Sequence, residues 1–114
     1  MKNSEIKENS FIMIEFENGK KEPYFVDRKG PGSVSGATML LGHTLSDLIK
    51  NPTLFPCSKN GGTDRYYIAN EKVTGKDSRV KDYHNLSKEE KRDCLNKLKP
   101  VTQLAPLLKI LSAN

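Results

Sequence analysis

Tryptophan is absent from this chain of 114 residues, cysteine occurs only twice, and no long hydrophobic run is present. A membrane-spanning helix needs about 18 consecutive apolar residues, so we expect no membrane insertion. Cys57 and Cys94 stand in no CxxC or Cys/His ligand spacing, which predicts reduced thiols and no metal site. Cys94 lies beside Leu95 and Leu98, so we expect it on the inner face of a helix as a small hydrophobic residue. The first residues are polar and mixed in charge, without the pattern of a secretory signal. We therefore expect a cytoplasmic protein, or one delivered into a host cytosol without a conventional signal peptide.

Motifs for cofactors and catalysis are also missing. The glycine-rich stretch Gly30–Gly36 has no Lys-Ser/Thr of a P-loop, and Ser35 stands where a dinucleotide fingerprint needs its third glycine. We expect no cofactor there, and interpret the stretch as a loop that a partner contacts. Cys57 with His43 or His84 is the only thiol nucleophile and base set, but no spacing brings these groups together. We name no catalytic residue, and an enzymatic activity is not favoured.

A β-hairpin over residues 11–16 and 21–27 is the clearest local pattern. Both strands are apolar, and Asn18-Gly19 lies between them. This dipeptide is typical of a two-residue type I′ turn, because Asn and Gly tolerate positive φ. The register that follows pairs Glu17 with Lys20, Ile14 with Pro23 and Ile12 with Phe25.

Two further expectations follow from this register. Pro23 has no N–H, so the second strand should be a sheet edge, and a third strand should pair with residues 11–16. Ile12, Ile14 and Phe25 would share one face of the hairpin. The other face would also be apolar and would need a loop, a helix or a partner to cover it. Its residues are Phe11, Met13, Tyr24 and Val26.

The rest of the chain predicts an α+β domain over residues 11–114, after a flexible lead-in over 1–10. We expect a third strand near 65–70, in a small mixed or antiparallel sheet, and helices near 38–50, 88–98 and 105–112. The first helix has two possible starts, near Ala37 or at Thr44, where Thr44–Asp47 resembles a capping box; we favour the longer helix. Ser87 and Glu90 form a Ser-x-x-Glu box before the second helix.

The order of these elements resembles the ubiquitin-like β-grasp, in which a helix crosses a hairpin whose first strand is central and whose second is an edge. Tyr67–Val73 and Val80–Tyr83 are similar to a late strand and an Asp-Tyr-containing loop of that fold. The last residues, Leu111–Asn114, lack the terminal Gly-Gly that conjugation requires. The resemblance thus implies a β-grasp-like topology and no conjugation.

Positive charge is concentrated in the second half of the chain. Residues 1–57 contain seven basic and seven acidic residues, whereas residues 58–114 contain twelve basic and seven acidic ones. The charges are interspersed, which favours a solvated surface over a dedicated polyanion site. A nucleic-acid-binding protein or small ribonuclease-like toxin is the alternative, with His84 as base and Arg79 and Lys81 on phosphate. Tyr66 or Tyr67 would then stack on a base.

The favoured hypothesis is a small, basic, non-enzymatic protein-binding module of the adaptor, inhibitor or effector type. Its partner would be another protein, with an acidic or apolar surface, that contacts the hairpin, the glycine-rich loop or the basic C-terminal half. The oligomeric state is open. The candidate contact residues are Met13, Tyr24, Val26, Arg28, Lys29, Tyr66, Arg79, Lys81, Lys88 and Arg92.

Overall fold

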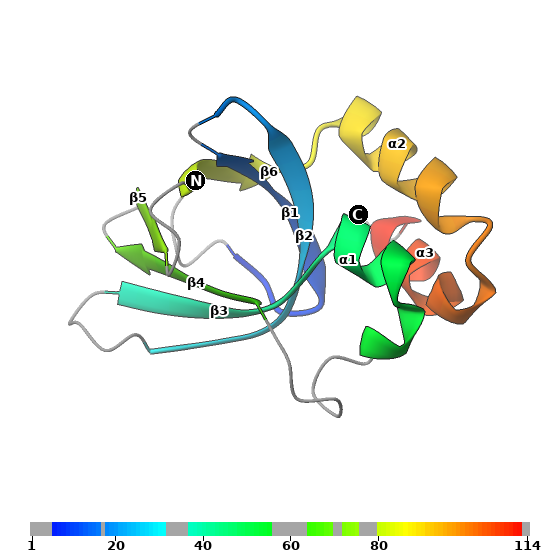
Figure 1. Cartoon of the computed structure of the whole chain (residues 1–114), viewed down its shortest axis with the longest axis horizontal. Coiled ribbons are helices and arrows are strands. Elements are labelled where there is room, and N and C mark those ends of the chain that lie inside the picture. The colour runs from blue at the N-terminus through cyan, green and yellow to red at the C-terminus, as the bar shows by residue number, and fades with distance from the viewer. Residues whose placement is uncertain are drawn as a thin grey trace.

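The computed structural model describes residues 6–16, 18–31, 37–55, 64–69, 72–75 and 80–112. Side chains are described over residues 6–16, 18–30, 39–55 and 82–112. The chain forms an α+β structure in which one sheet is covered by helices on one face (Figure 1). This agrees with the class predicted from the sequence.

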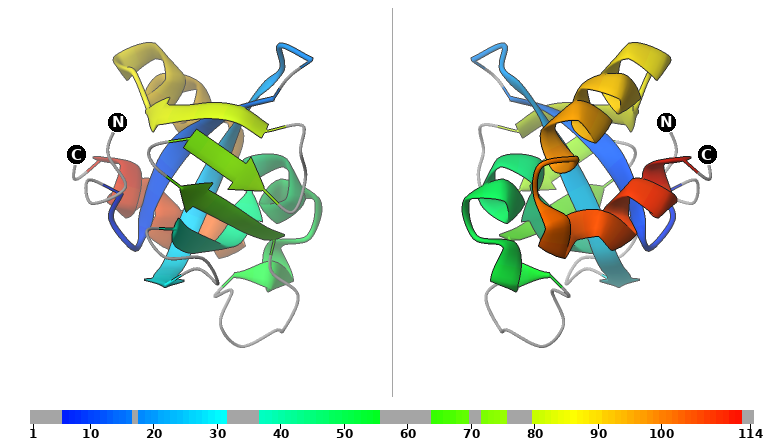
Figure 2. Two further views of the ribbon diagram at one scale, coloured as in Figure 1. Left: turned by 90° about the vertical axis from the view of Figure 1, so that its left-hand side faces the viewer. Right: turned by 90° about the vertical axis from the view of Figure 1, so that its right-hand side faces the viewer.

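Six strands form one antiparallel sheet in the order β5-β4-β3-β2-β1-β6. The first five strands follow each other as neighbours, and β6 returns to the free side of β1. The sheet curls so strongly that its two outer strands, β5 and β6, lie side by side (Figure 2). The strands are β1 (Ser10–Phe16), β2 (Lys21–Pro31), β3 (Ala37–Thr44), β4 (Asp64–Ala69), β5 (Lys72–Gly75) and β6 (Val80–Asn85).

The helices form a layer on the convex face of the sheet, against β1 and β2 (Figure 1). They are α1 (Leu45–Lys50), α2 (Lys88–Leu98) and α3 (Ala105–Ser112), with short 3-10 turns η2 (Pro52–Leu54) and η4 (Thr102–Leu104). The described helices include none that is long and apolar enough to cross a bilayer.

The hairpin β1-β2 is present, but its predicted register is wrong by one residue. The Gly19 N–H donates to the Phe16 carbonyl at 2.9 Å, and the Phe16 N–H donates to the Lys20 carbonyl at 2.8 Å. Phe16 and Lys20 therefore close the turn, which is one residue longer than a type I′ turn, with Gly19 at φ +87°. Ile14 thus pairs with Glu22 and Ile12 with Tyr24.

This shift redistributes the side chains between the two faces of the sheet. Tyr24 and Val26 join Ile12 and Ile14 on the concave face, in a buried cluster with Ile6, Leu40 and Tyr83. Phe25 instead joins Phe11 and Met13 on the convex face, where the Phe11 and Phe25 rings lie 5.2 Å apart between centroids. Both faces of the hairpin are therefore buried by the chain itself.

The expectation that the second strand is a sheet edge is also wrong. β2 lies between β1 and β3. Pro23 is tolerated because the β2-β3 ladder begins only at Tyr24, which pairs with Thr44, the last residue of β3. The strand expected near 65–70, β4, pairs with β3 and β5 and not with β1, whose second neighbour is the later strand β6. An internal second strand in an all-antiparallel sheet departs from the β-grasp topology that the sequence suggested.

Residues 37–44 form a strand, so the helix predicted over 38–50 is wrong in its first part. The helix begins at Leu45, with Thr44 as N-cap, which is the shorter alternative. The four-residue spacing of Leu41 and Leu45 suggested a continuous helix, but in the structure Leu40 points into the concave cluster and His43 pairs with Phe25. The backbone N–H and C=O groups of residues 37–44 form hydrogen bonds with β2 and β4. In the longer helix, the same groups would have bonded to each other within the helix.

The other predicted elements are confirmed. β4 covers the strand expected near 65–70, and α2 and α3 have the bounds expected from sequence. The Ser87 side chain accepts the Glu90 N–H at 3.2 Å, and the Glu90 carboxylate accepts the Ser87 N–H at 2.8 Å, so the capping box is complete.

Residues 6–9 pack against the sheet, although we expected them to belong to a flexible lead-in. The Ile6 side chain is fully buried in the concave cluster. The Lys29 ammonium group donates to the Ile6 carbonyl at 2.7 Å, and the Asn9 N–H donates to the Val26 carbonyl at 2.7 Å. This segment is therefore part of the folded domain.

Candidate functional site: the groove between α1 and α2

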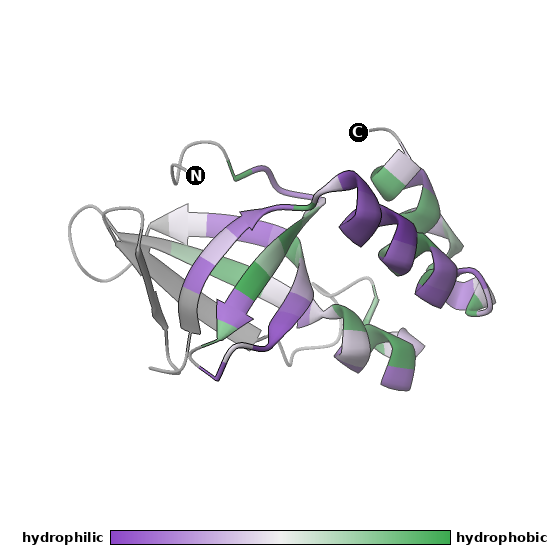
Figure 3. Cartoon of the chain, turned by 90° about the horizontal axis from the view of Figure 1, so that it is seen from above, coloured by the Kyte–Doolittle hydropathy of each residue, from purple (hydrophilic) through white to green (hydrophobic). Residues whose placement is uncertain are grey.

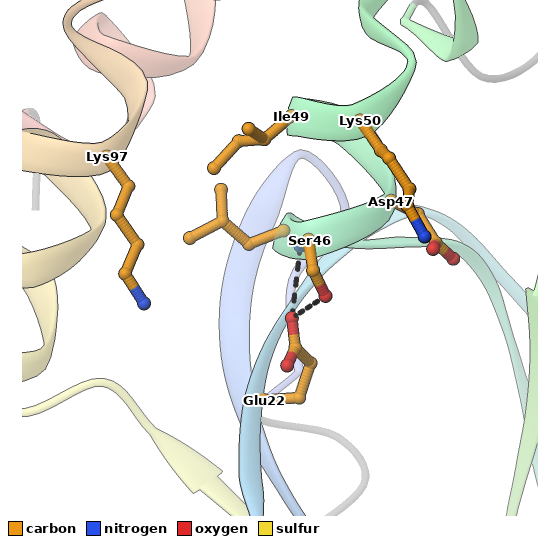
Figure 4. A pocket seen from close by; sticks show the side chains of 7 residues that line it. Glu22, Ser46, Asp47, Ile49, Lys50 and Lys97 are labelled. Carbon is orange, nitrogen blue, oxygen red and sulfur yellow. Dashed lines mark hydrogen bonds between the residues drawn. The ribbon is translucent and has the colours of Figure 1, made fainter.

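An open groove of about 540 Å³ separates α1 from the last turn of α2. Its floor includes Glu22 of β2, one bank belongs to α1, and Lys97 of α2 stands on the other bank (Figure 4). We call it the α1–α2 groove. Its lining residues are Glu22, Leu45, Ser46, Asp47, Ile49, Lys50 and Lys97.

The position of α1 is set by two side chains outside the helix. The Thr44 hydroxyl accepts the Asp47 N–H at 3.3 Å. The Glu22 carboxylate accepts the Ser46 N–H at 3.0 Å and the Ser46 hydroxyl at 2.5 Å. These bonds satisfy two N–H groups of the first turn, and the bond from Ser46 to Glu22 connects this helix of only six residues to β2.

The bank formed by α1 is apolar. Leu45 is 1% exposed and belongs to the core under the helices, while Ile49 is only partly buried at the edge of that core. In Figure 4 the Ile49 side chain extends into the space that Lys97 faces from α2. The groove thus exposes the margin of the hydrophobic core beside a cation.

The charged groups of the groove are unevenly engaged. Glu22 is held by Ser46, and Asp47 and Lys50 lie together on α1 at the rim of the groove (Figure 4). The Lys97 ammonium group forms no ion pair or hydrogen bond with any residue that the structure describes. Lys97 is therefore available to an anionic group entering the groove.

A second polar cluster joins β6 to α2. The His84 ring lies on the convex face, with Nε2 3.2 Å from Glu90 Oε1. Burial acts to raise the pKa of the Glu90 carboxyl, but the Ser87 N–H and the His84 ring together outweigh it and hold this pKa below its ordinary value. The contact between His84 and Glu90 therefore connects β6 to the first turn of α2.

Cys94 is a core residue, as the sequence predicted. It is a free thiol, 1% exposed, and packs among the leucines under the helices. Burial raises the pKa of the Cys94 thiol to about 11, so it stays protonated and unreactive near neutral pH.

The structure does not bring the predicted contact residues together at one site. Met13, Tyr24 and Val26 are 5%, 0% and 0% exposed, so the chain buries the apolar face that we expected a partner to cover. Met13 lies in the convex core, whereas the other two lie in the concave cluster. None of the three is available for docking.

Four of the predicted basic residues lie at the surface. Arg28 is exposed beside Asp27, with Nε 3.5 Å from the carboxylate, and the Lys29 side chain is engaged by the Ile6 carbonyl. Lys88 and Arg92 are exposed one turn apart on α2, whose outer side is strongly hydrophilic (Figure 3). These two pairs lie on different elements and form no common patch with the groove.

The remaining candidates lie partly outside the described residues. Tyr66 belongs to β4 and Lys81 to β6, but their side chains are not among those described. Arg79 and Cys57 lie outside the described residues, as does most of the glycine-rich stretch. His43 is 4% exposed, which removes it as an accessible base. Within the described part of the chain, no group of His, Cys, Asp and Glu side chains is arranged to hold a metal ion.

Ile49 and Lys97 were not identified from the sequence. No candidate residue was taken from the helix predicted over 38–50, and Lys97 was one of the interspersed charges in the second half of the chain. The sequence did contain one signal for this geometry, the Thr44–Asp47 capping pattern. This pattern favours a short helix that begins after Thr44, so that the residues before it can form a strand.

Comparisons with known proteins give this groove no counterpart. No protein-family model matches the chain, no curated protein matches its sequence, and no solved structure matches its fold.

Proposed function

We propose that this chain is a small non-enzymatic protein-binding module, of the adaptor, inhibitor or effector type, whose partner docks in the α1–α2 groove. The observation that carries the proposal is the partly buried Ile49 beside Lys97, whose ammonium group has no partner among the described residues. An apolar centre with a polar rim is the usual composition of a protein-binding site. The groove also has the volume typical of ligand sites.

The groove replaces the hairpin as the proposed docking surface, because the hairpin residues are buried. The basic second half of the chain still supports the proposal, since Lys97 belongs to it. A location in the cytoplasm, where thiols stay reduced, agrees with the free thiol of Cys94 and is part of the same proposal.

The nucleic-acid alternative receives less support. Glu90 already occupies Nε2 of His84 and also closes the α2 cap, so this carboxylate serves the fold. A nuclease of this kind would lose cleavage of RNA in a His84→Ala variant, and its affinity for RNA would fall steeply with salt. Neither behaviour is expected of the module.

Site-specific photo-crosslinking tests the proposal. Lys50 at the groove rim and Lys109 on α3 are both exposed lysines near a helix end, and only the first lines the groove. With benzoyl-phenylalanine at position 50, we expect one crosslinked protein from cells that express the chain. With the same group at position 109 we expect none. Equal yields at both positions, or crosslinks to nucleic acid alone, would contradict docking in the groove.

A further inference from the structure

We infer that the α1–α2 groove selects an acidic peptide segment, in which a branched apolar side chain is followed directly by Asp or Glu. The inference rests on the proposed function and specifies the partner's chemistry. It concerns a short stretch of a partner protein rather than a nucleic acid or a lipid surface.

The apolar half of this preference comes from α1. Ile49 offers aliphatic surface at the margin of the core, above the buried Leu45, and a leucine side chain from a partner would complete the burial of Ile49. A groove built on such a core margin is already formed before binding, so little ordering cost opposes docking.

The acidic half comes from the charges around the groove. Lys97 has no partner among the residues that the structure describes, whereas the floor carboxylate of Glu22 already accepts two hydrogen bonds from Ser46. The other charged lining residues, Asp47 and Lys50, carry opposite charges. The Lys97 ammonium group therefore favours a carboxylate and disfavours a lysine at the corresponding position of the peptide.

Nuclear magnetic resonance titration with capped synthetic peptides tests this preference on the intact chain. The probes are Gly-Leu-Glu-Gly, Gly-Leu-Lys-Gly and Gly-Ser-Glu-Gly, each added to millimolar concentration. We expect the first peptide to shift the amide signals of Ile49, Lys97 and their neighbours, with an affinity about fivefold higher than that of either other peptide.

Variants at the two banks separate the contributions. Lys97→Glu should reverse the preference toward the lysine peptide, while Lys99→Glu, a charge reversal in the same turn but outside the groove lining, should preserve it. Glu22→Gln keeps an acceptor for Ser46 and removes a like charge, so it should strengthen binding of the acidic peptide about twofold. If Lys97→Glu unfolds the chain, Lys97→Gln serves instead and should abolish the preference without reversing it.

The outcomes distinguish this inference from the proposed function. Equal binding of the glutamate and lysine peptides, with shifts still centred on Ile49, would overturn the acidic preference and leave docking in the groove intact. Failure of all three peptides to shift signals at the groove would overturn the preference as well, and only the photo-crosslinking result at position 50 would then bear on the proposed function.

Discussion

His84 Nε2 lies 3.2 Å from Oε1 and 3.3 Å from Oε2 of Glu90, so one carboxylate ties the last strand of the sheet to the first turn of α2. The same Oε1 accepts the Ser87 N–H at 2.8 Å. Glu90 therefore has two tasks, capping the helix and holding it against β6. Loss of its charge should release both.

Glu90→Gln should lower the free energy of unfolding by about 1 kcal/mol at pH 7, because the variant keeps the shape of the side chain and loses its charge. The pKa of Glu90 lies below its ordinary value of 4.5 in the folded chain. The stabilisation is therefore fully present above about pH 4.5 and is lost as the pH falls through the folded-state pKa. Urea unfolding between pH 7 and pH 3 should show the gap between wild type and variant closing.

The matched control is Glu89→Gln, in the same first turn of α2. Glu89 is exposed, and its negative charge interacts favourably with the positive end of the helix dipole. We therefore expect Glu89→Gln to lower the free energy of unfolding by only a few tenths of a kcal/mol. A constant gap between wild type and Glu90→Gln across the whole pH range would contradict the role of its charge.

Ile6→Ala should destabilise the chain by about 2 to 4 kcal/mol, because it removes a fully buried side chain from the concave cluster. Lys7→Ala is the control: Lys7 is exposed, and only its backbone carbonyl is used, by the Ser10 hydroxyl. Chemical denaturation of both variants measures the difference. Equal stabilities would show that residues 6–9 are not part of the folded domain.

Gly42→Ala should be among the most destabilising single changes in the chain. Gly42 pairs with Val26 beside an irregularity in the β2-β3 ladder, and a Cβ there would overlap the Phe25 carbonyl oxygen and lie 3.2 Å from the Asp27 nitrogen. The strands would have to separate, at a cost of about 3 kcal/mol or more. Thermal unfolding measured by circular dichroism should show a large drop in Tm.

Gly30→Ala provides the comparison for Gly42→Ala. It lies on β2 with open space around the position of a Cβ, so we expect a change within about 0.5 kcal/mol. A Tm for Gly42→Ala close to that of Gly30→Ala would refute the close approach of β2 and β3.

Cys94 should resist thiol reagents while the chain is folded. In a Cys57→Ser background, the pKa of about 11 lowers the thiolate fraction at pH 8 about 100-fold relative to a thiol with the ordinary pKa of 9.0. Burial slows the reaction further. Reaction with a chromogenic disulfide should be at least about 100-fold slower in buffer than in urea. Comparable rates would mean that the side chain of Cys94 is not buried in the core between α2 and the sheet.

The predictions that succeeded rest on contacts between residues close in sequence. Ser87 and Glu90 bond each other within one turn, so their spacing alone predicts the start of α2. The hairpin was also predicted correctly as an element. Its register was predicted wrongly. The turn is closed by Phe16 and Lys20, whereas the prediction paired Glu17 with Lys20. The two turns differ little in free energy, but a shift of one residue moves every side chain of a strand to the other face of the sheet.

The candidate site depends on residues far apart in the chain. Glu22, Ile49 and Lys97 belong to β2, α1 and α2, and no sequence pattern links them. The groove exists because β3 ends at Thr44 and the short helix α1 then lies beside the last turn of α2. The long-helix interpretation of residues 38–50 removed that geometry and with it the site.

By itself, the amino-acid sequence determined the α+β class, the hairpin, the two C-terminal helices and the inward position of Cys94, since each follows from local periodicity, capping or turn chemistry. Only the tertiary structure decided that residues 37–44 are a strand, that both faces of the hairpin are buried, and that Ile49 lies near Lys97, which has no partner in the described part of the chain. The physical reason is that strand pairing and face burial gain their free energy from partners distant in sequence, which local propensity does not contain.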